Sequence, residues 1–211
     1  MVMRTPILTI TRFVLLMAMG SLATLTLAAT MAVIPLEQQR QILRDPGTAM
    51  LGAANSEVTL VEYFDYNCPY CRKLAPEIHA LVDQNHRVGV VFKDWPIFGG
   101  VSVYAARSAL ASQWQGKYLV AHAALISAPR LSREAEVDDT LQKAGIDVAA
   151  LKRALVEHSA QIDAILARNN TEARSLGIRG TPGLLVGRAV TTGVGDLAGL
   201  QSAVAAARSV Q

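Results

Sequence analysis

The sequence predicts an α/β fold that carries an inserted all-helical domain, and three observations support this. Residues 57–100 contain a strand, a helix and a second strand, in that order. Residues 101–176 show helical periodicity and no strand signal, and residues 177–211 contain two short strands and a helix. Because strands joined through a helix run parallel, we expect the first two strands to be parallel neighbours in a sheet.

The first strand–helix–strand unit is clear in the residues themselves. The stretch EVTLVEYF, residues 57–64, is rich in β-branched and aromatic residues, which is typical of a strand. From Pro69 onward, apolar residues recur at the spacing of an amphipathic helix. Pro69 suits the first turn of that helix, where its missing N–H costs nothing. The stretch RVGVVFKDWP, residues 87–96, then predicts the second strand.

The rest of the chain completes this pattern. The Ala- and Leu-rich residues 101–176 predict several helices, of which one ends near Gly145. Residues 183–187 and 189–193 predict a hairpin, and a last helix is expected from about Asp196 to Ser209. A strand–helix–strand half and a strand–strand–helix half in one sheet, with a helical block between them, form the thioredoxin fold with an inserted helical domain.

Residues 1–32 are typical of a signal peptide or an N-terminal membrane anchor. Arg4 and Arg12 precede the uncharged apolar run FVLLMAMGSLATLTLAA, which ends in small residues. Cleavage would remove this leader, although about 20 apolar residues can also span a bilayer. In both cases we expect the body of the protein outside the cytosol. Residues 33–56 form an N-terminal arm, in which residues 35–46 suggest a short polar helix.

The charge of the body is nearly balanced. The chain has 20 Lys and Arg residues and 17 Asp and Glu residues. Two arginines lie in the leader and every acidic residue lies beyond residue 36, so the body carries 18 basic and 17 acidic side chains, a net of +1. No cluster of Lys and Arg with interleaved aromatic residues is present. These features exclude nucleic acid as an expected partner.

Cys68 and Cys71 are the only two cysteines in the sequence. A structural disulfide usually closes a long loop, because its entropic benefit grows with loop length, and a gap of two residues closes almost nothing. A structural zinc site normally needs four ligands, and no further cysteine is available. The reduced pair could still bind copper, because thiolates suit Cu(I). A redox couple agrees with the spacing and with an oxidising compartment.

The expected position of the pair favours redox chemistry. Cys68 falls where the first strand ends and the helix begins. Unpaired N–H groups and the positive end of the helix dipole stabilise an anion there, so we expect the pKa of the Cys68 thiol to lie well below its usual value. Cys68 is then expected to be the exposed, attacking sulfur. Cys71, one turn further along, is expected to be buried and to resolve the mixed disulfide.

A second motif lies far along the chain. The stretch IRGTPGLLVG places Thr181 and Pro182 directly before a predicted strand. Proline is tolerated at the start of a strand, because it cannot donate to the ladder. A cis peptide bond at this position would mark a tight turn, although an ordinary loop proline fits the local sequence equally well.

With EYFDYNCPYC, VVFKDWPIFGG and GIRGTPGLLVG in this order and spacing, the sequence resembles the DsbA-type thiol:disulfide oxidoreductases of the bacterial cell envelope, over roughly residues 55–208. The resemblance implies that Pro182 is cis and faces the cysteine pair, and that Thr181 contacts the attacking sulfur. It also implies a buried acid six residues before the first cysteine, which is Glu62, and a lysine partner after the second strand, which is Lys93. Glu62 would move the proton of Cys71, and Lys93 would tune the pKa of Glu62; a purely structural ion pair is the alternative.

The resemblance therefore implies a periplasmic protein that exchanges the Cys68–Cys71 disulfide with cysteines of envelope proteins. No cofactor is expected beyond the pair itself, and a membrane partner is expected to reoxidise or reduce it. Two residue choices differ from those of the strong oxidases: the dipeptide Pro69-Tyr70 contains no histidine, and Thr181 stands before the proline, as in disulfide isomerases. An isomerase or reductase and a copper-handling protein therefore remain alternatives.

Overall fold

The computed structural model of the protein describes residues 32–45, 49–53, 55–191 and 193–209. The predicted leader, residues 1–32, lies outside the described residues except for Ala32. Among the described helices, none is long and apolar enough to cross a membrane.

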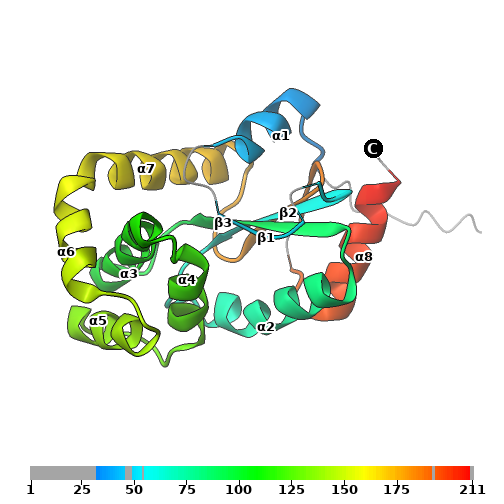
Figure 1. The fold of residues 1–211 in the computed structure, drawn as a ribbon. Helices are drawn as coiled ribbons and strands as arrows, with labels where there is room; N and C mark the ends of the chain where they lie inside the picture. Colours follow the sequence, from blue (N-terminus) through cyan, green and yellow to red (C-terminus); the bar gives the residue numbers. More distant parts are fainter. Residues whose placement is uncertain (1–31, 46–48, 54, 192, 210–211) are drawn as a thin grey trace, which may run out of the picture. The chain divides into compact units, whose positions relative to one another are not determined.

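A five-stranded mixed sheet forms the centre of the fold (Figure 1). Its strands lie in the order β1-β3-β2-β4-β5. They are β1 (Ala49–Gly52), β2 (Val58–Phe64), β3 (Val88–Asp94), β4 (Gly183–Val186) and β5 (Ala189–Thr191). As predicted, β2 and β3 are parallel and β4 and β5 form an antiparallel hairpin. The thioredoxin arrangement expected from the sequence is confirmed.

The arm that precedes β2 contributes to both edges of this sheet, which the sequence did not predict. Strand β1 pairs with β3 in the antiparallel direction. At the other edge Val33 forms a bridge with Ala189, where the N–H of Ile34 donates to the carbonyl of Arg188 at 2.8 Å. Between these two contacts lies α1 (Leu36–Leu43), the predicted polar helix. The arm is therefore built into the sheet rather than appended to it.

Helices cover both faces of the sheet. Helices α2 (Pro69–Gln84) and α8 (Leu197–Arg208) cover one face, and α1 and α7 (Ser159–Ser175) cover the other (Figure 1). Alternation along each strand assigns side chains to these faces. Leu60 and Phe64 of β2 belong to the hydrophobic cluster under α2, whereas Val61 and Tyr63 belong to the cluster under α7. We call these the α2 face and the α7 face.

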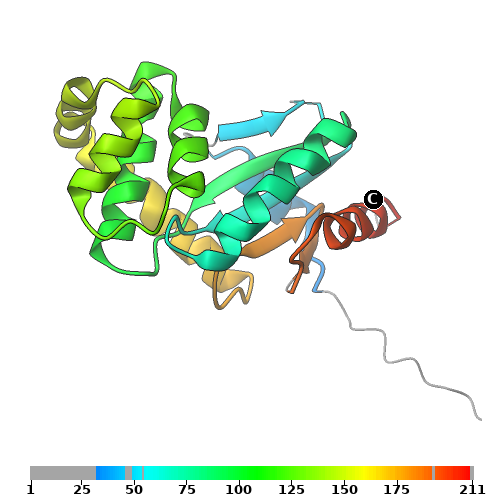
Figure 2. The ribbon, with the colours of Figure 1, turned by 90° about the horizontal axis from the view of Figure 1, so that it is seen from below.

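The inserted segment is entirely helical, as predicted. Its helices are α3 (Gly100–Ala111), the 3₁₀ turn η1 (Ser112–Gln115), α4 (Tyr118–Ser127), α5 (Glu134–Lys143) and α6 (Val148–Glu157), followed by α7. Helices α3 to α6 gather at one end of the sheet (Figure 2), and α7 runs from them over the sheet (Figure 1). Gly145 follows α5 with a φ of 83°, a left-handed conformation that favours glycine. Leu141 and Leu151 are fully buried in the same cluster as the α2 face, so the insertion shares the core of the sheet.

Candidate active site

The two cysteines lie at the start of α2. Cys68 is the N-cap residue of this helix, Pro69 occupies its first turn, and Cys71 is buried one turn further in. Both cysteines are free thiols. The placement predicted from the sequence is confirmed: β2 ends at Phe64, a short connection follows, and the helix begins directly after Cys68.

The prediction that Cys68 is exposed is wrong. Its exposed fraction is 0%, because the loop before β4 lies across the sulfur. The Cys68 thiol donates a hydrogen bond of 3.1 Å to the carbonyl oxygen of Thr181. The Thr181–Pro182 peptide bond is cis, as the resemblance implied. The loop that sequence reasoning placed near the pair is therefore in direct contact with its first sulfur.

The pKa of the Cys68 thiol is lowered to about 6. The main cause is a hydrogen bond from the Cys71 side chain, and the Thr181 side chain and the backbone N–H groups of Cys71 and Tyr70 add to it, against the opposing effect of burial. The Thr181 hydroxyl is buried without a hydrogen-bond partner of ordinary geometry among the described residues, so it is free to turn toward the sulfur. A thiol in these surroundings is mostly thiolate at neutral pH.

Cys71 and Glu62 have the opposite electrostatic character. Burial raises the pKa of Cys71 far above its usual range, and its hydrogen bond to Cys68 and the nearby Glu62 carboxylate raise it further. Glu62, on the α2 face of β2, is buried, and its Oε1 has no hydrogen-bond partner in the described part of the chain. Burial, and then the negative charge of Cys68, raise the pKa of Glu62 to about 8. A carboxyl group that is neutral near pH 7 therefore lies close to the resolving thiol.

The predicted pairing of Lys93 with Glu62 is wrong. In the parallel register Glu62 lies opposite Phe92, and Lys93 lies opposite Tyr63. Because side chains alternate along a strand, Lys93 points to the α7 face, away from Cys71. Its Nζ instead forms ion pairs with Asp45 and, at 3.1 Å, with Glu172. Lys93 belongs to a buried network on the far side of the sheet, not to the cysteine site.

Two polar residues before Cys68 hold the site in place, and sequence reasoning missed both. The Asp65 carboxylate accepts hydrogen bonds from the backbone N–H groups of Asn67, Ile97 and Phe98 at 2.6–2.9 Å. The Asn67 side chain donates to the carbonyl of Leu131 and accepts from its N–H. Asp and Asn at the end of a strand often bind nearby backbone groups in this way, so the stretch DYN before Cys68 carried a usable signal.

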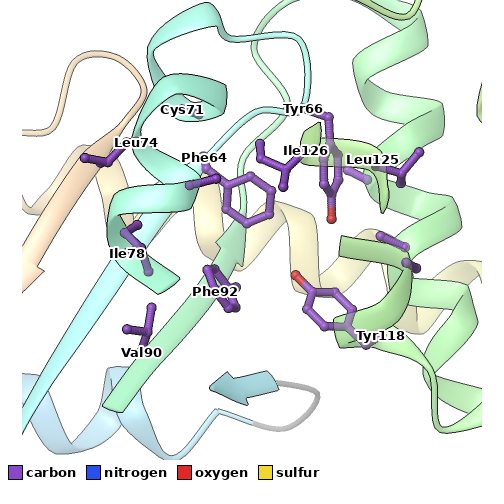
Figure 3. Packing of buried hydrophobic residues seen from close by; sticks show 14 of the residues in the cluster. Phe64, Tyr66, Cys71, Leu74, Ile78, Val90, Phe92, Tyr118, Leu125 and Ile126 are labelled. Carbon is purple, nitrogen blue, oxygen red and sulfur yellow. The ribbon is translucent and has the colours of Figure 1, made fainter. Parts of the chain in front are cut away.

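A second buried polar cluster lies beside this site on the α2 face. The Tyr118 hydroxyl donates to the Asp94 carboxylate at 2.6 Å, and the Tyr66 hydroxyl lies 3.4 Å from Nδ1 of His122. Figure 3 shows the hydroxyls of Tyr66 and Tyr118 turned toward each other among apolar side chains. Burial raises the pKa of Asp94 to about 7 and lowers that of His122 to about 3. The inserted helices thus bring polar groups to the core next to the pair.

A groove of about 400 Å³ opens next to the cysteine pair. Its residues come from the start of α2, from the cis-proline loop and from the segment after β5; among them are Tyr70, Lys73, Thr181, Pro182 and Val194. The side chain of Tyr70 is 71% exposed, so this residue of the dipeptide faces solvent and not the sulfurs. In the described part of the chain, no group of three or more His, Cys, Asp or Glu residues is placed to hold a metal ion.

Comparisons with known proteins agree with this geometry. A family model described as a DSBA-like thioredoxin domain matches residues 59–205. A thioredoxin-like oxidoreductase from Silicibacter pomeroyi is 36% identical, with a TM-score of 0.77 over 83% of this chain and 99% of its own. The thiol-disulfide exchange protein alpha-DsbA2 from Wolbachia pipientis is 28% identical, with a TM-score of 0.74 over 81% of this chain and 92% of its own.

Two further similar proteins are more distant. A periplasmic thioredoxin-like protein from Salmonella enterica serovar Typhimurium is 26% identical, with a TM-score of 0.69 over 84% of this chain and 99% of its own. The Na⁺/H⁺ antiporter NhaA 1 of Salinispora arenicola is 25% identical over 178 residues, which are 83% of this chain. The match spans only 26% of that longer protein.

Proposed function

Because the chain belongs to the family of DsbA-like thioredoxin domains, a family of thiol:disulfide oxidoreductases, we propose that it donates the Cys68–Cys71 disulfide to cysteine-containing proteins of the cell envelope. The single observation that carries this proposal is the environment of Cys68. Its sulfur lies at the N-terminus of α2, where it receives hydrogen bonds from the Cys71 side chain and from backbone N–H groups, which lower its pKa to about 6.

The environment of Cys68 also supports the proposed direction of disulfide transfer. A thiolate exists only after the pair is reduced, so every interaction that stabilises the Cys68 thiolate stabilises the reduced form. A pair whose reduced form is stabilised is a stronger oxidant. The pKa of about 6 supports a donor of disulfides over a reductase.

In the proposed reaction, a substrate thiolate attacks the Cys68 sulfur and the Cys68–Cys71 bond breaks. Cys71 leaves with the bonding electrons and accepts the proton of the neutral Glu62 carboxyl, because the pKa of Cys71 is far above its usual range and that of Glu62 is about 8. A second substrate thiolate then attacks the substrate sulfur of the mixed disulfide. Cys68 leaves as a thiolate. The two substrate thiols are then joined in a disulfide, and the two electrons that they lost have reduced the cysteine pair.

The residues of the loop have supporting roles in this proposal. The Thr181 side chain helps to stabilise the Cys68 thiolate, and the backbone next to Pro182 would pair with the substrate segment as an added strand. The reaction needs no cofactor beyond the cysteine pair. A membrane redox partner would reoxidise the pair after each turnover.

The location in the envelope rests on two findings. The predicted leader, which lies outside the described residues, has the layout of an export signal. A protein of similar fold and 26% identity is described as periplasmic. An oxidising compartment is also where a donor of disulfides is useful.

An isomerase or reductase is the second candidate, and Thr181 and Tyr70 favour it. Thr181 stands where strong oxidases often carry valine, and the exposed Tyr70 gives the thiolate no imidazole partner. Copper handling is the third candidate, because two thiolates suit Cu(I). It requires a Cu(I) affinity that survives competition with a strong chelator.

The test is a pair of assays. We expect the purified oxidised protein to oxidise a reduced, unfolded protein stoichiometrically. We expect the Cys71→Ala variant, mixed with an unfolded protein that carries disulfides, to attack them through Cys68 and to accumulate mixed disulfides on non-reducing gels. The Cys68→Ala variant is the matched control and should trap nothing. If the wild-type protein instead reduces insulin faster than it oxidises the unfolded substrate, the reductase candidate replaces the proposal.

A further inference from the structure

A second groove lies beside the active-site loops, and the mechanism does not use it. It has a volume of about 480 Å³ and is lined by Trp95, Ile97, Arg174, Gly177, Ile178 and Arg179. We call it the Arg179 groove. One wall belongs to the segment after β3, and the other belongs to the end of α7 and to the segment between α7 and the cis-proline loop.

Both walls are attached to the parts of the chain that hold Cys68. Arg179 precedes Thr181 by two residues, and the carbonyl of Thr181 accepts the hydrogen bond of the Cys68 thiol. On the opposite wall, the N–H of Ile97 donates to Oδ2 of Asp65 at 2.6 Å, while the carbonyl of Asp65 accepts from the N–H of Cys68 at 3.0 Å. Each wall of the groove is therefore connected, through a few residues of backbone, to a group that contacts Cys68.

The groove is cationic and its charge is not neutralised by the residues that line it. Within the part of the chain that the structure describes, Arg179 has no hydrogen-bond or ion-pair partner, and Arg174 has only the neutral Asn170 side chain, at 3.0 Å. No Asp or Glu lines the groove among the described residues. Since the body of the protein is nearly neutral, this positive charge is local.

The lining also indicates what kind of group would fit. A guanidinium binds a carboxylate through two parallel hydrogen bonds, which gives both strength and orientation. The apolar walls, Ile97 at 43% exposure and the buried Ile178 and Trp95, match the methylene groups that precede the carboxylate of a glutamate. The groove next to the cysteine pair also favours an anionic group, because Lys73 is the only charged residue among its described lining.

We propose that the Arg179 groove binds an acidic side chain of the same polypeptide whose cysteine reacts with Cys68, so that Arg179 and Arg174 select substrates with an acidic residue near the reactive cysteine. This inference rests on the proposed function. An extended chain advances about 3.3 Å per residue, and Arg179 precedes the sulfur-binding residue by two positions. The acidic residue is therefore expected within about two to four residues of the cysteine.

The experiment uses the full oxidised protein and two sets of dithiol peptides. Within each set the peptides are identical except for Glu, Gln or Lys placed three residues from the first cysteine, on its N-terminal side in one set and on its C-terminal side in the other. The measured quantity is the second-order rate constant of peptide oxidation. In one of the two sets we expect the Glu peptide to react about three- to tenfold faster than the Lys peptide in about 50 mM salt. The difference should shrink in about 0.5 M salt, which screens the charges.

Reversing the charge of Arg179 distinguishes a direct role in substrate binding from a structural role. Arg179→Glu should invert the ranking, so that the Lys peptide reacts faster than the Glu peptide, while the Gln peptide keeps its wild-type rate within about twofold. A merely structural defect would slow all peptides together. Arg153→Glu, at an exposed position of α6, is the matched control and should keep the wild-type ranking.

Two results would overturn the inference while leaving the proposed function intact. One is equal oxidation of the Glu, Gln and Lys peptides by the wild-type protein in both sets. The other is a wild-type preference that Arg179→Glu leaves unchanged. If no peptide is oxidised at all, including the Gln peptides, the proposed function itself fails and the inference falls with it.

Discussion

The two faces of the central sheet differ in whether a cation lies beside their buried carboxyl groups. On the α7 face, Lys93 binds Asp45 and Glu172, Arg168 binds Asp45 at 2.8 Å, and the Tyr63 hydroxyl donates to Glu172 at 3.2 Å. On the α2 face, the buried carboxyl of Glu62 has a partnerless oxygen and no cation beside it among the described residues. Neighbouring strand positions thus lead to a paired network on one side and to an isolated acid on the other.

This difference affects the protonation of the buried carboxyl groups on each face. A cation beside a carboxylate favours its ionised form, and burial without a cation favours its neutral form. On the α7 face, burial opposes the ionisation of Asp45, but hydrogen bonds to Glu172 and Lys93 hold the pKa of Asp45 below its usual value, whereas burial and the hydrogen bond with Asp45 raise the pKa of Glu172 to about 7 against the effect of Lys93. Burial raises the pKa of Glu62 to about 8. The ion pairs of the α7 face connect the arm and α7 to the sheet, and the neutral Glu62 of the α2 face is the proton donor that we propose for Cys71.

Lys93→Met removes the buried lysine from the ion-pair network of the α7 face and has the largest expected effect. Removing one partner of a buried ion pair leaves uncompensated charges, so we expect the free energy of unfolding in urea to fall by about 3 kcal/mol. The alkylation midpoint of Cys68 should not move, because Lys93 lies on the opposite face. Lys152→Met removes an exposed pair with Asp138 and should change stability little. A loss of stability no greater than in Lys152→Met would show that the buried network does not contribute to the stability of the fold.

Glu62→Gln tests whether the buried carboxyl group of the α2 face is neutral in the folded protein. Because the folded-state pKa of about 8 lies above the ordinary value of 4.5, the neutral carboxyl contributes stability that is fully present below about pH 4.5 and is lost as the pH rises through about 8. For the reduced protein we therefore expect the variant to be more stable than wild type at pH 9, by at most about 5 kcal/mol, and nearly equal at pH 4.5.

The same variant should slow the step in which Cys71 accepts a proton, which stopped-flow measurement of disulfide reduction would detect at neutral pH. The exposed Glu157→Gln, on α6, is the control for both measurements. A parallel pH dependence of unfolding for wild type and Glu62→Gln would contradict the assignment of a neutral Glu62.

Thr181→Val tests the effect of the Thr181 hydroxyl on the Cys68 sulfur, and its expected effect is the smallest. The Thr181 side chain helps to lower the pKa of Cys68 to about 6, so its removal should raise the midpoint of Cys68 alkylation against pH. A hydrogen bond of about 0.5–1.5 kcal/mol corresponds to about 0.4–1 pKa unit. Thr171→Val, whose hydroxyl donates to Ala167 on the exposed side of α7, should leave the midpoint unchanged. An unshifted midpoint in Thr181→Val would show that the Thr181 hydroxyl does not stabilise the Cys68 thiolate.

The sequence was sufficient for the fold and for the cysteine pair because both rest on local patterns. Alternation and helical periodicity predicted β2, α2 and β3, and the position of Cys68 at the start of α2 followed from them. Strand β1 was missed, since AMLG is short and its pairing with β3 is a long-range contact at the edge of the sheet.

The errors at the site have the same physical origin. The exposure of Cys68 depends on the loop at Thr181, which lies 113 residues away in the chain. The partner of Lys93 depends on the register of two strands, and a shift by one residue exchanges the two faces of a strand. Local sequence patterns predict which residues are polar or apolar, but they do not specify such distant contacts.

The most direct test of the account is the redox equilibrium of Cys68–Cys71 with glutathione at pH 7. Stabilisation of the Cys68 thiolate predicts an oxidising pair, with a reduction potential between about −120 mV, the value of the strong oxidases, and about −200 mV. A potential near about −270 mV, the value of thioredoxin, would contradict the account and identify a reductase.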